Sequence, residues 1–234
     1  MTCSEYIASM GEDYKPLKRL SDKNGASVLL FRNTRLLRDI VLRQYPSAVE
    51  AYDILKSFRC ANLPEVFESL RFSDGQIVIE EYVSGITVAE ILETGKYTFK
   101  GAKKVLTGVC SAVCALHSLG IIHRDIKPEN VIITKEGAVK LIDLNASRLP
   151  SPDKARDTVA LGTVGYAPPE QYGISQSNFT ADIYAMGILL NVMLTGEHPG
   201  VKLARGKAGS IVLRCTSVSP DKRFQSAEKL MSAL

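Results

Sequence analysis

The residues with the clearest chemical potential lie in the run 123–130, which reads His-Arg-Asp-Ile-Lys-Pro-Glu-Asn. The run offers Asp125, Lys127 and Asn130, and Asp143 follows after an expected strand hairpin. A carboxylate can accept a hydroxyl proton, a lysine can offset the charge of a moving phosphoryl group, and amide and carboxylate oxygens suit magnesium. The set indicates phosphoryl transfer, and a polar turn with solvated charges is the simpler alternative.

The part of the chain before Gly85 reads mainly as strands. Runs rich in β-branched and aliphatic residues predict strands at Val28–Phe31, Ile40–Leu42, Val66–Phe72 and Gln76–Glu81. Between them, residues 47–58 form the single predicted helix. The pattern predicts a small antiparallel sheet with one helix laid on it.

After Gly85 the pattern becomes helical. A capping box at Thr87 and Glu90 opens one helix, and a long helix runs from 99 to 119, where Gly120 ends it. The later expected elements are strands at 131–134 and 139–142, an apolar central helix at 180–195, and closing helices at 210–216 and 226–234. The predicted fold class is α+β, with a β-rich lobe followed by an α-rich lobe.

Composition excludes several classes of protein. Of the 234 residues 45% are hydrophobic and 23% are charged, as in ordinary globular proteins. The net charge of +4, from 29 basic and 25 acidic residues spread along the chain, argues against a nucleic-acid surface and against a polybasic membrane anchor. The five cysteines contain no C-x-x-C pair, which favours a reducing cytoplasm over a disulfide scaffold or a zinc site.

Membrane insertion is also disfavoured. The segment Val105–Ile122 carries no Asp, Glu, Lys or Arg, but its Ser, Thr, Gly and His content makes it too polar for a lipid-facing span. Its apolar residues recur near helical spacing, which predicts a helix buried in a soluble domain. The opening residues, Met1–Gly11, lack the basic start and apolar run of a signal peptide.

The run 123–130 matches the pattern His-Arg-Asp-x-Lys-Pro-x-Asn at every fixed position, and the chain resembles the eukaryotic-like Ser/Thr protein kinases of bacteria. The similarity extends from about Tyr14 to Leu234. It implies a two-lobed kinase fold, with residues 1–82 as the nucleotide-binding lobe and residues 83–234 as the helical catalytic lobe of one kinase domain. It also implies a role in bacterial signalling.

The resemblance assigns roles to the catalytic run. Asp125 would orient the substrate hydroxyl and accept its proton, and Lys127 would neutralise the γ-phosphate. Asn130 and Asp143 would hold magnesium, and His123 would be a buried support of the loop. The implied cofactors are ATP and Mg²⁺, and the implied partner is a protein substrate, with the chain itself among the candidates.

Further motifs of the family follow downstream. Asp143-Leu144-Asn145 stands where the family has Asp-Phe-Gly, and residues 162–170 resemble the end of an activation segment that includes Thr163. The resemblance pairs Glu170 with Arg223 and makes Asp182 the buried cap of the catalytic loop. Thr158 is the preferred phosphorylation site, because a phosphate there would give Arg124 a bidentate partner; an unmodified threonine is the alternative.

The nucleotide-binding lobe departs from the family pattern. Aligning Val28 with the valine that ends the glycine-rich loop motif places Ser21, Lys23 and Ala26 at the glycine positions, and only Gly25 lies nearby. Glycines let backbone amides approach phosphates without side chains in the way. A phosphate clasp of the usual form is therefore not expected here.

The third-strand lysine of the family is replaced by Arg43. A planar guanidinium can contact a carboxylate and a phosphate, but not from the same point as an ammonium group. Its helix partner by resemblance is Glu50, although a second register points to Ala51. One alternative is that Arg43 and Glu50 are ordinary surface charges. Another is that Arg43 pairs with Glu80.

Residues 80–85 read as the hinge that contacts adenine. By resemblance, Glu81 and Val83 would meet the base through main-chain groups, and Glu80 would line the back of the adenine pocket. An acidic side chain is unusual there. Pairing of Glu80 with Arg43 would explain both departures together.

Three functions are compatible with these features. The leading hypothesis is an enzyme that transfers the γ-phosphate of Mg-ATP to Ser or Thr hydroxyls of proteins. The alternatives are a pseudokinase that senses nucleotide or acts as a scaffold, and a small-molecule kinase. Retention of Asp125, Lys127, Asn130 and Asp143 together favours activity, and the segment 162–170 favours a protein substrate.

Overall fold

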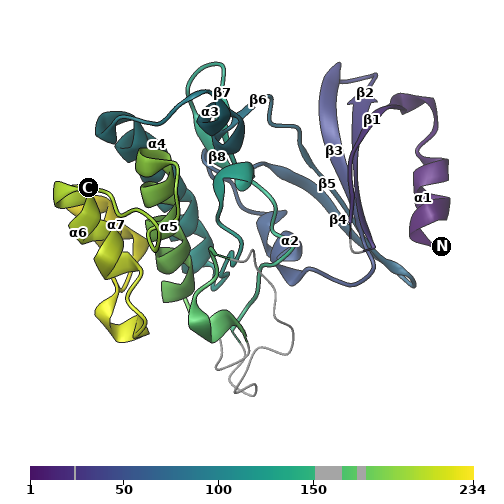
Figure 1. The fold of residues 1–234 in the computed structure, drawn as a ribbon. Helices are drawn as coiled ribbons and strands as arrows, with labels where there is room; N and C mark the ends of the chain where they lie inside the picture. Colours follow the sequence, from purple (N-terminus) through teal and green to yellow (C-terminus); the bar gives the residue numbers. More distant parts are fainter. Residues whose placement is uncertain (24, 151–164, 173–177) are drawn as a thin grey trace. The chain divides into compact units, whose positions relative to one another are not determined.

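The structure, a computed structural model, describes residues 1–23, 25–150, 165–172 and 178–234. Contacts group these residues into two compact units, shown in sequence colours in Figure 1. The first contains Met1–Cys60 and Pro64–Val83, and the second contains Ala61–Leu63 and Ser84–Leu234. The assignment of nucleotide binding and catalysis to residues 1–82 and 83–234 stays a prediction.

The first unit is an antiparallel sheet with strand order β1-β2-β3-β5-β4 and two α-helices. Its elements are α1 (Cys3–Ser9), a 3₁₀ turn (Gly11–Asp13), β1 (Tyr14–Lys23), β2 (Ala26–Asn33), β3 (Arg38–Tyr45), α2 (Glu50–Leu55), β4 (Val66–Phe72) and β5 (Gly75–Glu81). The four predicted strands are confirmed. The helix predicted at 47–58 is shorter, and it is not the only one.

The sequence did not reveal β1 or α1. β1 carries Lys15, Lys18 and Arg19 at an edge of the sheet, so it lacks the apolar alternation that marks a half-buried strand. The signal for α1 is its capping box, in which the side chains and backbone amides of Thr2 and Glu5 bond reciprocally.

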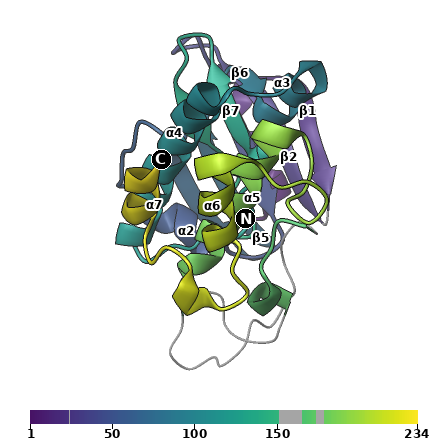
Figure 2. The ribbon, with the colours of Figure 1, turned by 60° about the vertical axis from the view of Figure 1, so that its left-hand side comes forward.

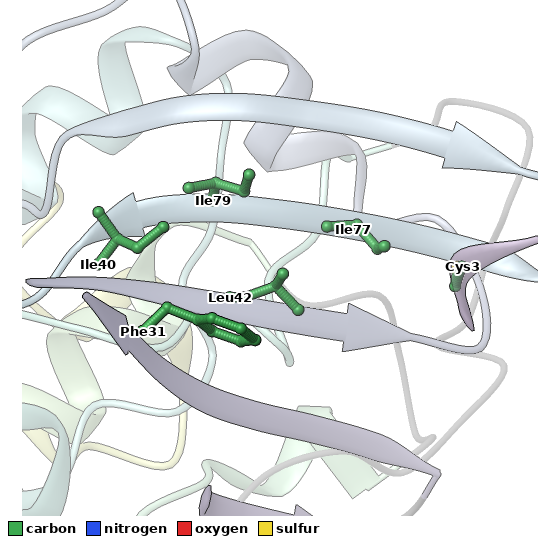
Figure 3. Close-up of a cluster of buried hydrophobic side chains, with 6 residues drawn as sticks. All are labelled: Cys3, Phe31, Ile40, Leu42, Ile77 and Ile79. Carbon is green, nitrogen blue, oxygen red and sulfur yellow. The ribbon is translucent and has the colours of Figure 1, made fainter. Parts of the chain in front are cut away.

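Alternation along the strands separates two faces of this sheet. On one face Phe31, Ile40, Leu42, Ile77 and Ile79 form a buried cluster with Cys3 of α1, as Figure 3 shows. The amide of Cys3 donates to Asp74 Oδ1 at 2.8 Å, which fixes the start of α1 to the β4–β5 turn. The short helix α1 is therefore held mainly by tertiary packing.

The opposite face of the sheet carries α2, so the two helices lie on either side of it (Figure 1). The hydroxyls of Tyr45 on β3 and Tyr52 on α2 lie 3.1 Å apart, and both side chains are buried. Since Arg43 is two residues from Tyr45, its side chain projects on the same face.

The second unit is mainly helical and contains a small sheet of order β6-β7-β8. Its elements are β6 (Gly85–Thr87), α3 (Val88–Thr94), α4 (Phe99–Ser118), β7 (Val131–Thr134), β8 (Val139–Leu141), α5 (Thr180–Thr195), α6 (Gly206–Cys215) and α7 (Ala227–Ala233), with 3₁₀ turns at Pro128–Asn130, Pro169–Tyr172 and Pro220–Lys222. The predicted elements of this half are confirmed, with small shifts at their ends.

The long helices pack closely around α5. Figure 2 shows α4, α5 and α6 side by side, and α5 is buried on nearly every side. At Gly187 of α5 an added Cβ would lie 2.3 Å from Cys215 Cβ, so the absent side chain permits the close approach of α6. No helix among the described residues is long and apolar enough to cross a membrane.

A buried ion pair joins the end of the expected activation segment to the last part of the chain. Arg223 Nη1 and Nη2 donate to Glu170 Oε1 and Oε2 at 2.6 and 3.0 Å. Arg223 also donates to the carbonyl oxygens of Ser217 and Thr180, at 2.8 and 3.1 Å. The predicted pair is confirmed, and its bidentate geometry satisfies charges that would otherwise be costly to bury.

Truncation of the cluster in Figure 3 tests the packing of the first unit. Leu42→Ala should lower the free energy of unfolding by about 2–5 kcal/mol, because Leu42 is fully buried and the truncation leaves a cavity. The matched control Leu36→Ala, at a side chain 60% exposed, should change it by less than about 0.5 kcal/mol. Urea unfolding followed by circular dichroism measures both, and equal effects would contradict the proposed core.

Candidate active site

The loop that joins α4 to β7 is anchored by one carboxylate, that of Asp182 in the first turn of α5. Asp182 Oδ2 accepts a hydrogen bond from the amide of His123 at 2.9 Å, and Oδ1 accepts one from the amide of Arg124, also at 2.9 Å. The Asp182 side chain is completely buried. The expectation that Asp182 caps this loop is confirmed.

A second histidine, His117 near the end of α4, completes this anchor. Its Nε2 lies 2.8 Å from Asp182 Oδ2, and its ring packs 4.6 Å from that of Phe179. Burial alone would raise the pKa of Asp182, but the hydrogen bond and charge of His117 and the amide of Arg124 outweigh it and lower that pKa. His117 could not be predicted from the sequence as part of this anchor, since only the fold brings the end of α4 to α5.

His123 supports the loop from inside. Its Nδ1 accepts from the amide of Asp125 at 3.3 Å, and its Nε2 lies 3.3 Å from the carbonyl oxygen of Ile142. One ring nitrogen that accepts and one that donates define the neutral tautomer. Burial lowers the pKa of His123, which agrees with a neutral ring. The structural role expected for this residue fits its contacts.

Two residues of the site have left-handed backbone although neither is glycine: Arg124 (φ 69°) and Asp143 (φ 68°). Such conformations cost free energy and persist where the surroundings enforce them, often at functional sites. At Arg124 the carbonyl oxygen accepts from Gln171 Nε2 at 2.8 Å. Burial, with a contribution from the charge of Arg148, lowers the pKa of Arg124 to about 10.

The structure brings Asp125, Lys127 and Asn130 together. Lys127 Nζ lies 2.8 Å from Asp125 Oδ2, and Asn130 Nδ2 donates to the same oxygen at 3.0 Å. The Asn130 amide also donates to the main-chain oxygen of Asp125 at 2.8 Å. The side chains of Asp125 and Lys127 keep 15% and 20% of their surface exposed. This is a preorganised carboxylate that still faces solvent.

Asp143 is held next to this group through the backbone. The amide of Ile142 donates to the carbonyl oxygen of Asn130 at 2.9 Å, so residues 130 and 143 are neighbours. Asn62 fixes the preceding strand, since its Nδ2 donates to the oxygen of Val139 and its own carbonyl oxygen accepts from the amide of Leu141. Leu144 is buried, as expected for the apolar residue after this aspartate.

The oxygen atoms available here suit a hard divalent cation bound jointly with a phosphate ligand. Within the described ranges, no group of three or more His, Cys, Asp or Glu side chains could hold a metal alone. Both hydrogen bonds given above for Asn130 use its Nδ2, which leaves Oδ1 as a potential ligand beside the carboxylate of Asp143.

In the first unit, the register places Val28 of β2 opposite Arg43 of β3, and Arg43 opposite Val78 of β5. Directly opposed residues share a face of the sheet. Arg43 Nε donates to Glu80 Oε1 at 2.6 Å, and the two side chains are only 8% and 5% exposed. The alternative pairing of Arg43 with Glu80 is confirmed. Glu50 is the exposed first residue of α2.

The β1–β2 hairpin has no glycine at the positions 21, 23 and 26 that align with the family's glycine-rich loop. Lys23 pairs with Ala26 in the antiparallel register, so only residues 24 and 25 join the strands, and Gly25 has φ +75°. At the other end of the sheet, the amide of Glu81 donates to the oxygen of Glu65 at 2.8 Å, and Val83 is buried. Thr158 and Thr163 lie outside the described residues.

Comparison with known proteins identifies relatives of this chain. The family model described as "Protein kinase domain" matches residues 39–230. Serine/threonine-protein kinase PknB of Mycobacterium tuberculosis is 31% identical over 184 residues, which cover 67% of this chain and 29% of that protein.

Two other similar proteins match shorter segments. Serine/threonine-protein kinase kin-29 of Caenorhabditis briggsae is 36% identical over 140 residues, covering 59% of this chain and 17% of that protein. Probable serine/threonine-protein kinase PknB of Lactococcus lactis is 34% identical over 140 residues, covering 59% of this chain and 22% of that protein. The chain thus spans less than a third of each of these relatives.

The neutral His123 predicts a pH dependence of stability. Its folded pKa lies below the unfolded value of 6.5, so its contribution is complete above about pH 6.5 and is lost as the pH falls toward the folded pKa. The free energy of unfolding should therefore fall by up to about 1.4 kcal/mol per pH unit below that point. The asparagine of the variant His123→Asn cannot titrate. The free energy of unfolding of this variant, measured by urea unfolding, should therefore fall less steeply below about pH 6.5. Parallel slopes would contradict the assignment.

Proposed function

Because this chain belongs to the protein kinase domain family, we propose that it transfers the γ-phosphate of Mg-ATP to serine or threonine hydroxyls of proteins, its own chain among them. The observation that carries the proposal is the grouping of Asp125, Lys127 and Asn130 in a loop whose amides are capped by Asp182. This arrangement offers a base, a cation and a metal ligand within one loop.

Asp125 acts as the base that accepts the hydroxyl proton of the substrate. Its carboxylate is oriented by Asn130 Nδ2 and by Lys127 Nζ, and it stays partly exposed, so a substrate hydroxyl can reach it. A hydroxyl bonded to a carboxylate is oriented for attack and loses its proton as the new bond to phosphorus forms.

Lys127 supplies positive charge where negative charge moves. In the structure its ammonium group is paired with Asp125. A lysine at this position can turn from the carboxylate to the γ-phosphate oxygens, because its stem is flexible and its three donors rotate. The ammonium group therefore offsets the charge of the carboxylate before substrate binds and stabilises the phosphoryl group during transfer.

Asn130 and Asp143 would hold magnesium through the amide Oδ1 and the carboxylate. The bound ion supplies electrostatic stabilisation of the phosphate oxygens. The left-handed backbone at Asp143 and the bond between Ile142 and Asn130 support the positioning of both ligands. The remaining ligands would be phosphate oxygens and water.

Residues of the first unit would bind the nucleotide. Val28 lies on the same face as Arg43 and would pack against the base or sugar, and Arg43 would contact phosphate while Glu80 orients it. Because the amide of Glu81 is already bonded, Glu81 would offer adenine its carbonyl oxygen, with Val83 offering main-chain groups. Glu50 stays a weaker candidate for the partner of Arg43, since it is exposed.

A cytoplasmic location completes the proposal. None of the five cysteines, all of which lie among the described residues, forms a disulfide, and Cys3, Cys110 and Cys215 are buried in the packed interior. Burial raises the pKa of Cys3 to about 11 and that of Cys215 to about 12, so both behave as apolar thiols. This use of cysteine is typical of a reducing compartment.

One observation favours a second candidate, a pseudokinase that binds partners or nucleotide without transfer. Arg43 is buried and bonded to Glu80, so its guanidinium is already engaged by a carboxylate. If that engagement is complete, the first unit lacks the phosphate contact that a strand-borne lysine normally makes. The two candidates differ in whether Arg43 contributes to ATP affinity.

Removal of the base tests the transfer step. Asp125→Asn should lower the rate of phosphate transfer to a generic protein substrate by about 10²–10⁴-fold, because the amide cannot accept the hydroxyl proton. The affinity for Mg-ATP should change little. The control Glu129→Gln alters an exposed neighbour and should retain full activity. Intact-mass measurement of substrate and enzyme follows the transfer, and an equally active Asp125→Asn would exclude this role.

Variants of the buried pair separate structure from nucleotide binding. Arg43→Met should destabilise the fold by about 3–5 kcal/mol, since it leaves Glu80 buried and unpaired, whereas Arg43→Met with Glu80→Met should restore stability. If Arg43 contacts phosphate, the stable double variant should bind Mg-ATP about 10- to 100-fold more weakly in calorimetry. Unchanged affinity would assign Arg43 a structural role alone and favour the pseudokinase.

A further inference from the structure

A hollow of about 610 Å³ lies in the second unit, where α4 begins, α5 ends and α6 begins. We call it the basic groove. Its lining residues are Lys96, Phe99, Leu194, Thr195, Lys202, Leu203, Ala204, Arg205, Lys207 and Ala208. The lining includes no residue of the loop 123–130, so the groove is separate from the candidate active site.

The floor of the basic groove is apolar. Phe99, the first residue of α4, keeps 37% of its surface exposed, and Leu194 and Leu203 are half-buried. Ala204 and Ala208 close the floor with small side chains. Recessed apolar surface of this kind favours insertion of a hydrophobic side chain from a ligand.

The rim of the groove is positively charged. Lys96, Lys202, Arg205 and Lys207 are all exposed residues of its lining. Lys202 pairs with Glu197 at 3.6 Å, and Lys207 Nζ lies 3.3 Å from the main-chain oxygen of Leu234. The four cationic side chains of the rim thus outnumber Glu197, which lies outside the lining.

The surrounding sequence strengthens this charge. The stretches 95–124 and 198–220, which provide nearly all of the lining, contain no Asp or Glu. The count of charged residues along the whole chain did not indicate this local charge, which arises because the fold brings two stretches without acidic residues together at one groove. A local positive potential attracts acidic ligands and steers their association.

We propose that the basic groove binds a segment of a partner protein in which acidic residues flank large apolar ones. The apolar side chains would enter the floor beside Phe99 and Leu203, and the acidic residues would meet Lys96, Lys202, Arg205 and Lys207 on the rim. The inference goes beyond the proposed phosphoryl transfer, because such binding would recruit a partner without any contact to the catalytic loop.

The shape and charge of the groove favour this occupant over two others. A lipid bilayer is best bound by apolar side chains that protrude, whereas these line a hollow. A fatty acid carries one carboxylate, which would leave most of the four rim cations without a counter-charge. A peptide segment supplies several carboxylates and apolar side chains along its length.

Fluorescence anisotropy of the full chain with a short labelled peptide, in which Leu and Phe alternate with Asp and Glu, tests the proposal. The variant Lys202→Glu with Arg205→Glu should weaken binding about tenfold or more, by replacing two attractions with repulsions. The control Lys100→Glu with Lys103→Glu makes the same change in charge at exposed α4 positions outside the lining, and should weaken it less than about threefold.

Two further peptides test the groove without changing the protein. A peptide with Lys in place of its acidic residues, and one with Ser in place of Leu and Phe, should each bind at least about tenfold more weakly to the parent chain. Absence of binding by the acidic, apolar peptide would overturn the proposal. Equal weakening by both protein variants, or binding to phosphatidylglycerol vesicles without binding to the peptide, would overturn it as well. None of these readouts depends on phosphate transfer.

Discussion

The buried carboxylate of Asp182 is the interaction on which the candidate active site depends. It lies at the start of a helix that is apolar nearly all round, and it accepts hydrogen bonds from two consecutive amides of the catalytic loop. A buried charge is tolerated only when its partners satisfy it, so the loop and the helix fix each other. The path that these bonds impose on the loop accounts for the contacts of His123 and His117 and for the left-handed backbone of Arg124.

The two units differ in how closely they follow the kinase pattern. The loop of the second unit brings together Asp125, Lys127 and Asn130, which are the proposed base, cation and metal ligand. The first unit lacks the glycines of the family's phosphate loop and buries Arg43 against Glu80. A buried ion pair is weak evidence for stability by itself, because desolvation offsets much of the attraction. The pair therefore leaves open whether Arg43 also binds phosphate, which is the point on which the two candidate functions differ.

The grouping of Asp125, Lys127 and Asn130 was predictable from sequence, because these residues lie within six positions and their contacts with one another are local. Glu170 and Arg223 were predictable only through resemblance, since 52 residues separate them in the sequence and the fold alone brings them together. Strand β1 was missed because an edge strand with Lys15 and Lys18 has no apolar alternation. The basic groove was missed because net charge averages over surfaces that the fold separates.

The turnover rate for phosphate transfer by Asp182→Asn, beside the parent chain, tests the central claim most directly. An asparagine side chain offers one acceptor oxygen in place of two, so one of the amides of His123 and Arg124 loses its bond. The account predicts that the parent transfers phosphate and that the folded variant does so about 100-fold more slowly, with little change in ATP affinity. A folded variant with the turnover of the parent, or a parent without transfer, would contradict it.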